Sequence, residues 1–128
     1  MSAIKGKNTK PEIVVRKVLH ALGYRFRLHY KDLPGKPDII LPRYKTVIFV
    51  NGCFWHRHPG CRYASMPSTN VEFWRAKFRE NVERDLKNYS RLRDMGWNVA
   101  VLWTCEIKSL VQNEEISFSL DEIIKRGM

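Results

Sequence analysis

The amino-acid sequence predicts a mixed α/β (α+β) fold, in which helices flank a mixed sheet and the elements follow the order α-β-β-β-α-β-α. Two segments carry apolar residues at helical spacing, one near the start of the chain and one in its middle. Short apolar or alternating runs between and after them are typical of strands. A length of 128 residues with 44% hydrophobic residues predicts one folded domain spanning residues 1–128.

The first predicted helix begins at Thr9 and ends near Leu22. Thr9 can cap the helix, Pro11 is tolerated in its first turn, and Gly23 follows its end. Glu12 occupies the capping-box position, three residues after the cap. The expected apolar stripe consists of Ile13, Val14, Val18 and Leu22.

The remaining elements follow from their hydrophobic periodicity. Three runs before the second helix predict strands, at 24–28, 37–41 and 46–50, and the last is apolar enough to be central. A long loop is expected at 51–69, and loops of that length are usually functional. The later elements are a helix at 70–94, a strand at 97–103, a short helical turn at 106–110 and a terminal helix at 116–125.

The net charge of +10 favours binding to a polyanion, most simply a nucleic-acid backbone. The surplus is local, because residues 1–31 hold eight basic residues and only one acidic residue, Glu12. Residues 1–8 are expected to form a basic arm that lies on phosphates. No apolar run approaches the roughly 20 residues of a membrane helix, so a soluble intracellular protein is expected.

Three cysteines and two histidines indicate a metal site. Cys53, His58 and Cys61 lie within nine residues, and Cys105 follows the last strand. Three thiolates and one imidazole fit a tetrahedral structural zinc ion with no open position. Three buried apolar cysteines are the alternative. His56 could replace His58 as the ligand, but its neighbours favour another role.

A second group of residues favours phosphodiester chemistry. Pro37-Asp38 opens a strand after a helix that carries Glu12, an arrangement typical of restriction-enzyme-type nuclease folds. Asp38 can hold Mg²⁺, whereas the third strand ends in Phe49-Val50-Asn51 and lacks the usual Glu-x-Lys. His56 is therefore the candidate base and Asp85 the carboxylate that orients it. The alternatives are a turn aspartate at Asp38 and a structural ion pair at Asp85.

Phe54 and Trp55 lie beside the predicted metal site. The two rings could belong to the core, or they could insert between the bases of a bound nucleic acid. The sequence alone leaves both interpretations open.

Taken together, these residues resemble the bacterial very-short-patch repair endonucleases (Vsr), and the resemblance runs from Met1 to about Leu110. The run Gly52-Cys53-Phe54-Trp55-His56, at this distance from Pro37-Asp38, is its most specific part. The other motifs that carry it are Asn8-Thr9-Lys10-Pro11-Glu12, Leu33-Pro34-Gly35-Lys36, Val47-Ile48-Phe49, Phe73-Trp74, Asn81-Val82-Glu83-Arg84-Asp85, Gly96-Trp97 and Trp103 with Cys105.

The resemblance implies a restriction-endonuclease-like core and a Mg²⁺-dependent, strand-specific nick on the 5′ side of the thymine of a T:G mismatch. Such mismatches arise when 5-methylcytosine deaminates. The implied partner is double-stranded DNA, with mismatch-repair proteins as further partners. A monomer in the bacterial cytoplasm, associated with the nucleoid, is expected.

The resemblance also implies roles for single residues. Asp38, assisted by the backbone carbonyl of Val50, resembles the Mg²⁺ ligand. His56 with Asp85 resembles the base that activates water, and Glu12 the acid that holds metal-bound waters.

Further roles concern the rings and the cysteines. Phe54 and Trp55 resemble rings that intercalate beside the mismatch, with Met1 as a third wedge from the opposite side. Asn51 stands where well-characterised relatives carry a second histidine. The residues that match the structural zinc ligands are Cys53, His58, Cys61 and Cys105.

Two other functions remain open at this point. One is a nuclease of the same fold with another DNA target. The other is a zinc-stabilised DNA-binding module without catalysis, and a purely structural zinc protein is a weaker third reading. The combination of Asp38, His56, Asp85 and Glu12 argues against the DNA-binding module, because binding alone does not require it. The net charge of +10 argues against a purely structural zinc protein.

Overall fold

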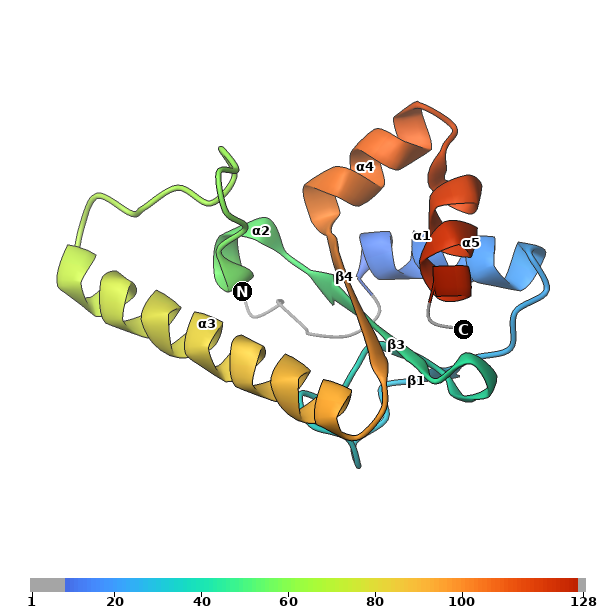
Figure 1. Ribbon diagram of the computed structural model, residues 1–128. Helices are drawn as coiled ribbons and strands as arrows, with labels where there is room; N and C mark the ends of the chain where they lie inside the picture. The colour runs from blue at the N-terminus through green and yellow to red at the C-terminus, as the bar shows by residue number, and fades with distance from the viewer. Residues whose placement is uncertain (1–8, 127–128) are drawn as a thin grey trace.

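The computed structural model describes residues 9–126, so that Met1 and the predicted basic arm at residues 1–8 lie outside the described part of the chain. A four-stranded sheet has helices on both of its faces (Figure 1). The strands lie in the order β1 (Arg27–Leu28), β2 (Ile39–Leu41), β3 (Thr46–Asn51) and β4 (Asn98–Trp103). The β1–β2 and β2–β3 pairs are antiparallel, and β3 and β4 run parallel. The predicted mixed sheet is confirmed.

One face of the sheet packs against three helices, α1 (Lys10–Ala21), α4 (Thr104–Gln112) and α5 (Ile116–Arg126). Alternate residues of the two inner strands point to this side, and they bury the apolar stripes of the helices. Fully buried leucines and isoleucines of this kind contribute roughly 1.5–3 kcal/mol each. The core residues shared by strands and helices include Leu19, Ile39, Ile48, Leu120 and Ile124.

The other face packs against the long helix α3 (Val71–Asp94). Tyr89 and Leu92 of α3 contact Val47 and Phe49 of β3. β3 is therefore covered on both faces, as its continuous apolar sequence predicts. Asp85 lies on the same helix at the border of the buried stripe, which is where the spacing predicts it.

Several boundaries differ from the sequence prediction. β1 spans only two residues instead of 24–28, because Tyr24 and Phe26 pack against the core before strand pairing begins. The predicted loop 51–69 contains a one-turn helix, α2 (Cys53–His56). α4 begins directly at Thr104 and is nine residues long rather than a short turn. A 3-10 turn, η1 (Pro42–Tyr44), joins β2 to β3.

The buried face of α1 lies about one position away from the apolar stripe that the sequence predicts. Its fully buried residues are Glu12, Val15 and Leu19, whereas Leu22 is 39% exposed because the helix has already ended. Val14 and Val18 flank the buried line. A charged residue was not expected on the buried face of α1, and Glu12 is paired there with Arg16 and His29.

Among residues 9–126, none of the helices is both long and apolar enough to cross a membrane.

Candidate active site

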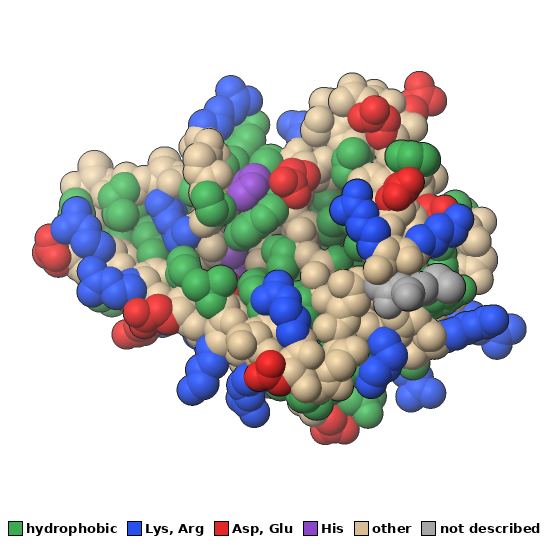
Figure 2. All heavy atoms as spheres, viewed as in Figure 1, with side chains coloured by type: hydrophobic (Ala, Val, Ile, Leu, Met, Phe, Trp, Pro, Cys, Tyr) green, Lys and Arg blue, Asp and Glu red, His purple; other side chains and the backbone are tan. Residues whose placement is uncertain are grey.

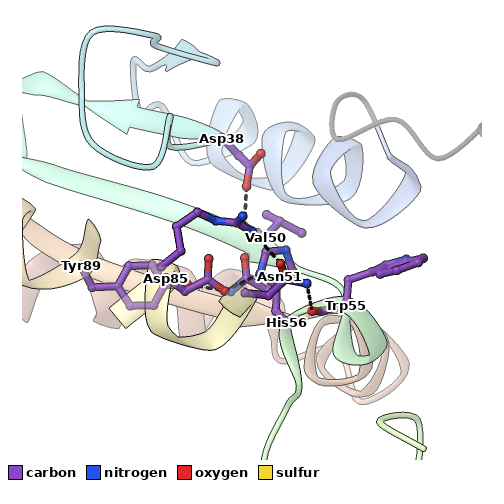
Figure 3. Close-up of polar contacts among 9 residues, drawn as sticks. Asp38, Val50, Asn51, Trp55, His56, Asp85 and Tyr89 are labelled. Carbon is purple, nitrogen blue, oxygen red and sulfur yellow. Dashed lines mark hydrogen bonds and ion pairs between the residues drawn. The ribbon is translucent and has the colours of Figure 1, made fainter. Parts of the chain in front are cut away.

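A cleft of about 400 Å³ opens at the end of the sheet where β3 stops. Asp38 enters it from the start of β2, Val50 from the end of β3, His56 from α2 and Asp85 from α3 (Figure 3). β2 and β3 are antiparallel, so the start of one strand lies beside the end of the other. The structure thus brings four predicted site residues, far apart in sequence, into one cavity.

His56 and Asp85 form a hydrogen-bonded pair in this cleft. Nδ1 of His56 lies 2.7 Å from Oδ2 of Asp85, and the side chains are 32% and 17% exposed. An ionised carboxylate only accepts hydrogen bonds, so the contact places the proton of a neutral ring on Nδ1. Within residues 9–126, Nε2 has no hydrogen-bond partner. The geometry therefore leaves Nε2 available to accept a proton from a water molecule.

Asp38 lies deeper in the cleft. Its Oδ2 accepts a hydrogen bond of 2.7 Å from the backbone N–H of Val50. Burial raises the pKa of Asp38 to about 6, and the neighbouring charge of Glu12 adds to this rise, although the Val50 hydrogen bond opposes it. A nearby cation would stabilise the ionised form of this carboxylate, which burial disfavours in the free protein.

A cluster of metal-ligating side chains surrounds Asp38. Ligand atoms of Glu12, His29 and Asp38 all lie within 4.8 Å of one another. Oxygen-rich clusters of this kind fit a hard divalent cation. The chemistry of the donors is therefore compatible with the metal dependence of nucleases.

Glu12 is only 1% exposed, and two neighbours hold its carboxylate. Arg16 donates to it from the next turn of α1, and Nε2 of His29 lies 2.7 Å from its Oε2. The capping-box role is not observed, because Thr9 makes no side-chain cap. The buried charge of Glu12 is instead directed toward the group around Asp38.

His29 was missed by the sequence analysis. Its backbone N–H donates to the carbonyl of Asp38 at 3.0 Å, which extends the pairing of β1 with β2. An antiparallel register between the two predicted strands would have placed His29 opposite Asp38. The signal was therefore present in the sequence, but it required the correct strand pairing.

Asn51 occupies the inner wall of the cleft. It is 3% exposed, and its Nδ2 donates to the hydroxyl of Tyr89 at 2.8 Å. Burial is the main reason that the pKa of Tyr89 rises to about 12. The pair is therefore neutral and links the end of β3 to α3.

The rings of Phe54 and Trp55 differ in exposure. Phe54 is half-buried and packs edge-on against Phe78 with ring centroids 5.2 Å apart, whereas Trp55 is 38% exposed. The sequence analysis gave no role to Trp74, and its ring centroid lies 6.0 Å from that of Trp55. Asn81 also donates to the carbonyl of Trp55. Figure 2 shows hydrophobic side chains beside histidine on one face, with lysine and arginine side chains around them.

The four predicted ligands of the second metal site converge. Nδ1 of His58 lies 3.4 Å from the Cys105 sulfur and 3.6 Å from the Cys53 sulfur. The sulfurs of Cys61 and Cys105 are 3.9 Å apart. Such spacings allow all four atoms to hold one metal ion. His56 is not part of this group, because it pairs with Asp85.

The surroundings of this metal centre orient its ligands. The His58 ring stacks on Trp103 with centroids 4.3 Å apart, and its Nε2 lies 3.7 Å from Glu106. Burial alone would raise the pKa of the Cys53 thiol, but hydrogen bonds led by that with Thr104 lower it to about 7. Burial and the neighbouring thiols raise the pKa of Cys105 to about 12. A bound cation would favour ionisation of these thiols.

Comparisons with known proteins agree with this chemistry. The family model described as DNA mismatch endonuclease Vsr matches residues 1–62. The type II nicking enzyme V.XorIIP of Xanthomonas oryzae is 49% identical over 86% of this chain and 80% of its own length. The type II nicking enzyme V.NmeAIP of Neisseria meningitidis is 47% identical over 85% of this chain and 77% of its own length. The DNA mismatch endonuclease Vsr of Escherichia coli is 38% identical over 97% of this chain and 80% of its own length.

Proposed function

Because this chain belongs to the Vsr family of DNA mismatch endonucleases, which have a restriction-endonuclease-like fold, we propose that it nicks duplex DNA at T:G mismatches. This mismatch is the lesion left when 5-methylcytosine deaminates, and the nick falls on the 5′ side of its thymine. The observation that carries this proposal is the pairing of His56 with Asp85 in the same cleft as Asp38. DNA binding alone gives no reason for that arrangement.

Asp38 and the backbone carbonyl of Val50 would hold Mg²⁺. The Val50 N–H already points to Asp38, and in a strand the carbonyl of a residue points to the same side as its N–H. Glu12, fixed by Arg16 and His29, would accept hydrogen bonds from water around the ion. The bound cation would neutralise charge on the phosphate and on the departing oxygen.

His56 acts as the general base. Its Nε2 removes a proton from a water molecule as the water oxygen bonds to phosphorus. The bond between phosphorus and the 3′ oxygen breaks, and that oxygen takes a proton from solvent. Asp85 stabilises the imidazolium that forms and keeps the ring oriented.

The wedge is assigned to Phe54 and Trp55. The exposed Trp55 ring lies at the rim of the cleft and can stack on a base, while Phe54 is anchored against Phe78. Met1, the third wedge expected from the sequence, lies outside the described residues.

The Cys53, His58, Cys61 and Cys105 centre is assigned to Zn²⁺. Three thiolates and one imidazole satisfy tetrahedral zinc, which leaves no position for a reacting water. The centre joins α2 to the start of α4 and therefore has a structural role. The enzyme is proposed to act as a monomer in the bacterial cytoplasm, alongside mismatch-repair proteins.

A nicking assay on labelled duplexes tests this function. Three duplexes of one sequence, with a T:G, a T:A or a C:G pair at the same position, are incubated with excess enzyme with and without Mg²⁺. Nicking of the thymine strand, only in the T:G duplex and only with Mg²⁺, is expected. Nicking of all three duplexes would favour a nuclease with another target. Binding without any nick would favour a non-catalytic module.

Replacing Asp38 by asparagine should abolish nicking and stabilise the ion-free protein. The pKa of Asp38 is about 6 when folded and 3.8 in its reference state, so the native protein binds this proton more tightly. Stability therefore falls as pH rises from about 4 through 6, by about 3 kcal/mol. Asparagine never ionises and removes this cost.

Thermal melts at pH 5 and pH 7.5 check this prediction. At pH 7.5 without Mg²⁺, Asp38→Asn should melt higher than the wild type. Mg²⁺ should raise the melting temperature of the wild type at pH 7.5, much less at pH 5, and not at all in the variant. An equal response of both proteins to Mg²⁺ would remove Asp38 from the ion site.

A further inference from the structure

The cleft contains one cationic side chain that the proposed mechanism does not use. Of the described residues that line it, Lys36 is the only lysine or arginine. β3 ends in Phe49-Val50-Asn51, so the lysine expected on this strand in restriction-type nucleases is absent. Lys36 belongs instead to the turn that precedes Asp38, and it lines the same cavity from there.

The turn that carries Lys36 is held rigidly. The N–H of Lys36 donates to the carbonyl of Leu33 at 3.0 Å. Gly35 has φ +75°, and a Cβ added there would lie 3.1 Å from Cβ of Asn88 and 3.2 Å from the Phe49 ring. The turn therefore packs directly on α3 and β3, with no space for a side chain at Gly35.

The backbone of Lys36 itself adopts a costly conformation. Its φ is +49°, in the left-handed region that residues with a Cβ rarely occupy, at a cost on the order of 1 kcal/mol. The buried Pro37 follows and further restricts the preceding backbone. The surrounding packing maintains this conformation, so the point from which the Lys36 side chain enters the cleft is fixed.

The charge of the cleft favours a cationic side chain beside the phosphate. Asp38, Asp85 and the nearby Glu12 are acidic, and hydrolysis adds negative charge to a phosphodiester that is already an anion. Lys36 is exposed and forms no ion pair with any acidic residue among residues 9–126. Its ammonium group is therefore available to the substrate.

We propose that Lys36 is a catalytic residue whose ammonium group contacts a non-bridging oxygen of the scissile phosphate. It supplies from the turn before β2 the positive charge that a lysine on β3 would otherwise supply. No proton is transferred, and the group acts by stabilising the charge that develops in the transition state. This inference rests on the proposed nicking function and assigns a further residue to it.

Single-turnover nicking of the T:G duplex by three variants tests the proposal. Lys36→Met removes the charge at similar length, and Lys36→Arg retains it. Lys31→Met is the matched control, because Lys31 is exposed on the same loop but does not line the cleft. At saturating enzyme, Lys36→Met should be about 10²-fold slower than the wild type, as for loss of one oxyanion donor. Lys36→Arg should recover most of the rate, and Lys31→Met should match the wild type.

Two further measurements separate the outcomes. Affinity for the duplex, from fluorescence anisotropy, should change far less than the rate in Lys36→Met, because the contact strengthens in the transition state. Wild-type speed in Lys36→Met, or equal losses in the Met and Arg variants, would overturn the role of Lys36. If the wild type nicks the T:G duplex and Asp38→Asn does not, the proposed function is upheld, whether or not Lys36 has the role proposed here. If the wild type nicks only the T:A and C:G duplexes, the rates of Lys36→Met and Lys36→Arg on those duplexes decide the role of Lys36.

Discussion

Replacing His56 by alanine should lower the rate of nicking by about 10³-fold, the typical contribution of a general base. The imidazole is held at Nδ1 by Asp85 and faces the cleft with a free Nε2, and its removal takes away the one imidazole among the described residues that line the cleft. Asp85→Asn should cost about 10²-fold or more, because an amide no longer enforces the tautomer or stabilises the imidazolium. Single-turnover rates at saturating enzyme measure both effects.

His20→Ala is the matched control for this experiment. His20 lies exposed at the last turn of α1, away from the cleft, so its removal should not change the rate. The double variant of His56 and Asp85 should be hardly slower than His56→Ala alone, since the two residues act as one unit. Undiminished nicking by His56→Ala would contradict its assignment as the base.

Cys61→Ala should lose the bound zinc and much of the stability of the protein. An ion present at 1,000 times its dissociation constant stabilises the folded state by about 4 kcal/mol. Losing that term should lower the melting temperature by roughly 10–20 °C in a chain of this size. Elemental analysis of the purified protein and a thermal melt give both quantities. One zinc per wild-type chain and almost none in the variant are expected.

The two neighbouring histidines provide an internal control for the metal centre. His58→Ala should lose zinc as Cys61→Ala does, whereas His56→Ala should retain it and melt near the wild type. His58 lies within 3.6 Å of two cysteine sulfurs, while His56 is bound to Asp85 on a different element. A wild type purified without zinc, or a full complement of zinc in His58→Ala, would refute the assignment.

The mixed sheet and the order of its elements along the chain could be predicted because the strand signals are strong and local. β3 is apolar along its whole length, and β2 is bounded by prolines on both sides, so few other placements were possible. The one-turn helix α2 could not be predicted. Four residues have no helical stability of their own, and tertiary contacts of Cys53 and His56 determine that turn.

The residues of the candidate site were easier to predict than their contacts. Asp38, His56 and Asp85 attract attention because their chemistry is unusual for their positions. His29 and Lys36 were not recognised as site residues, because a histidine that follows a strand and a lysine in a turn are both ordinary in sequence. Only the pairing of β1 with β2 and the close packing of Gly35 give these two residues a fixed place.

Helix α2 carries Cys53 at one end and His56 at the other, so the proposed zinc ligand and the proposed catalytic ring share a single helical turn. A chelator would therefore act on this enzyme twice: by stripping Mg²⁺ from Asp38, and by releasing the turn that presents His56. Inhibition by EDTA would thus report on two ions. Activity that returns on adding Mg²⁺ alone reflects the first ion, and the part that requires zinc as well reflects the second.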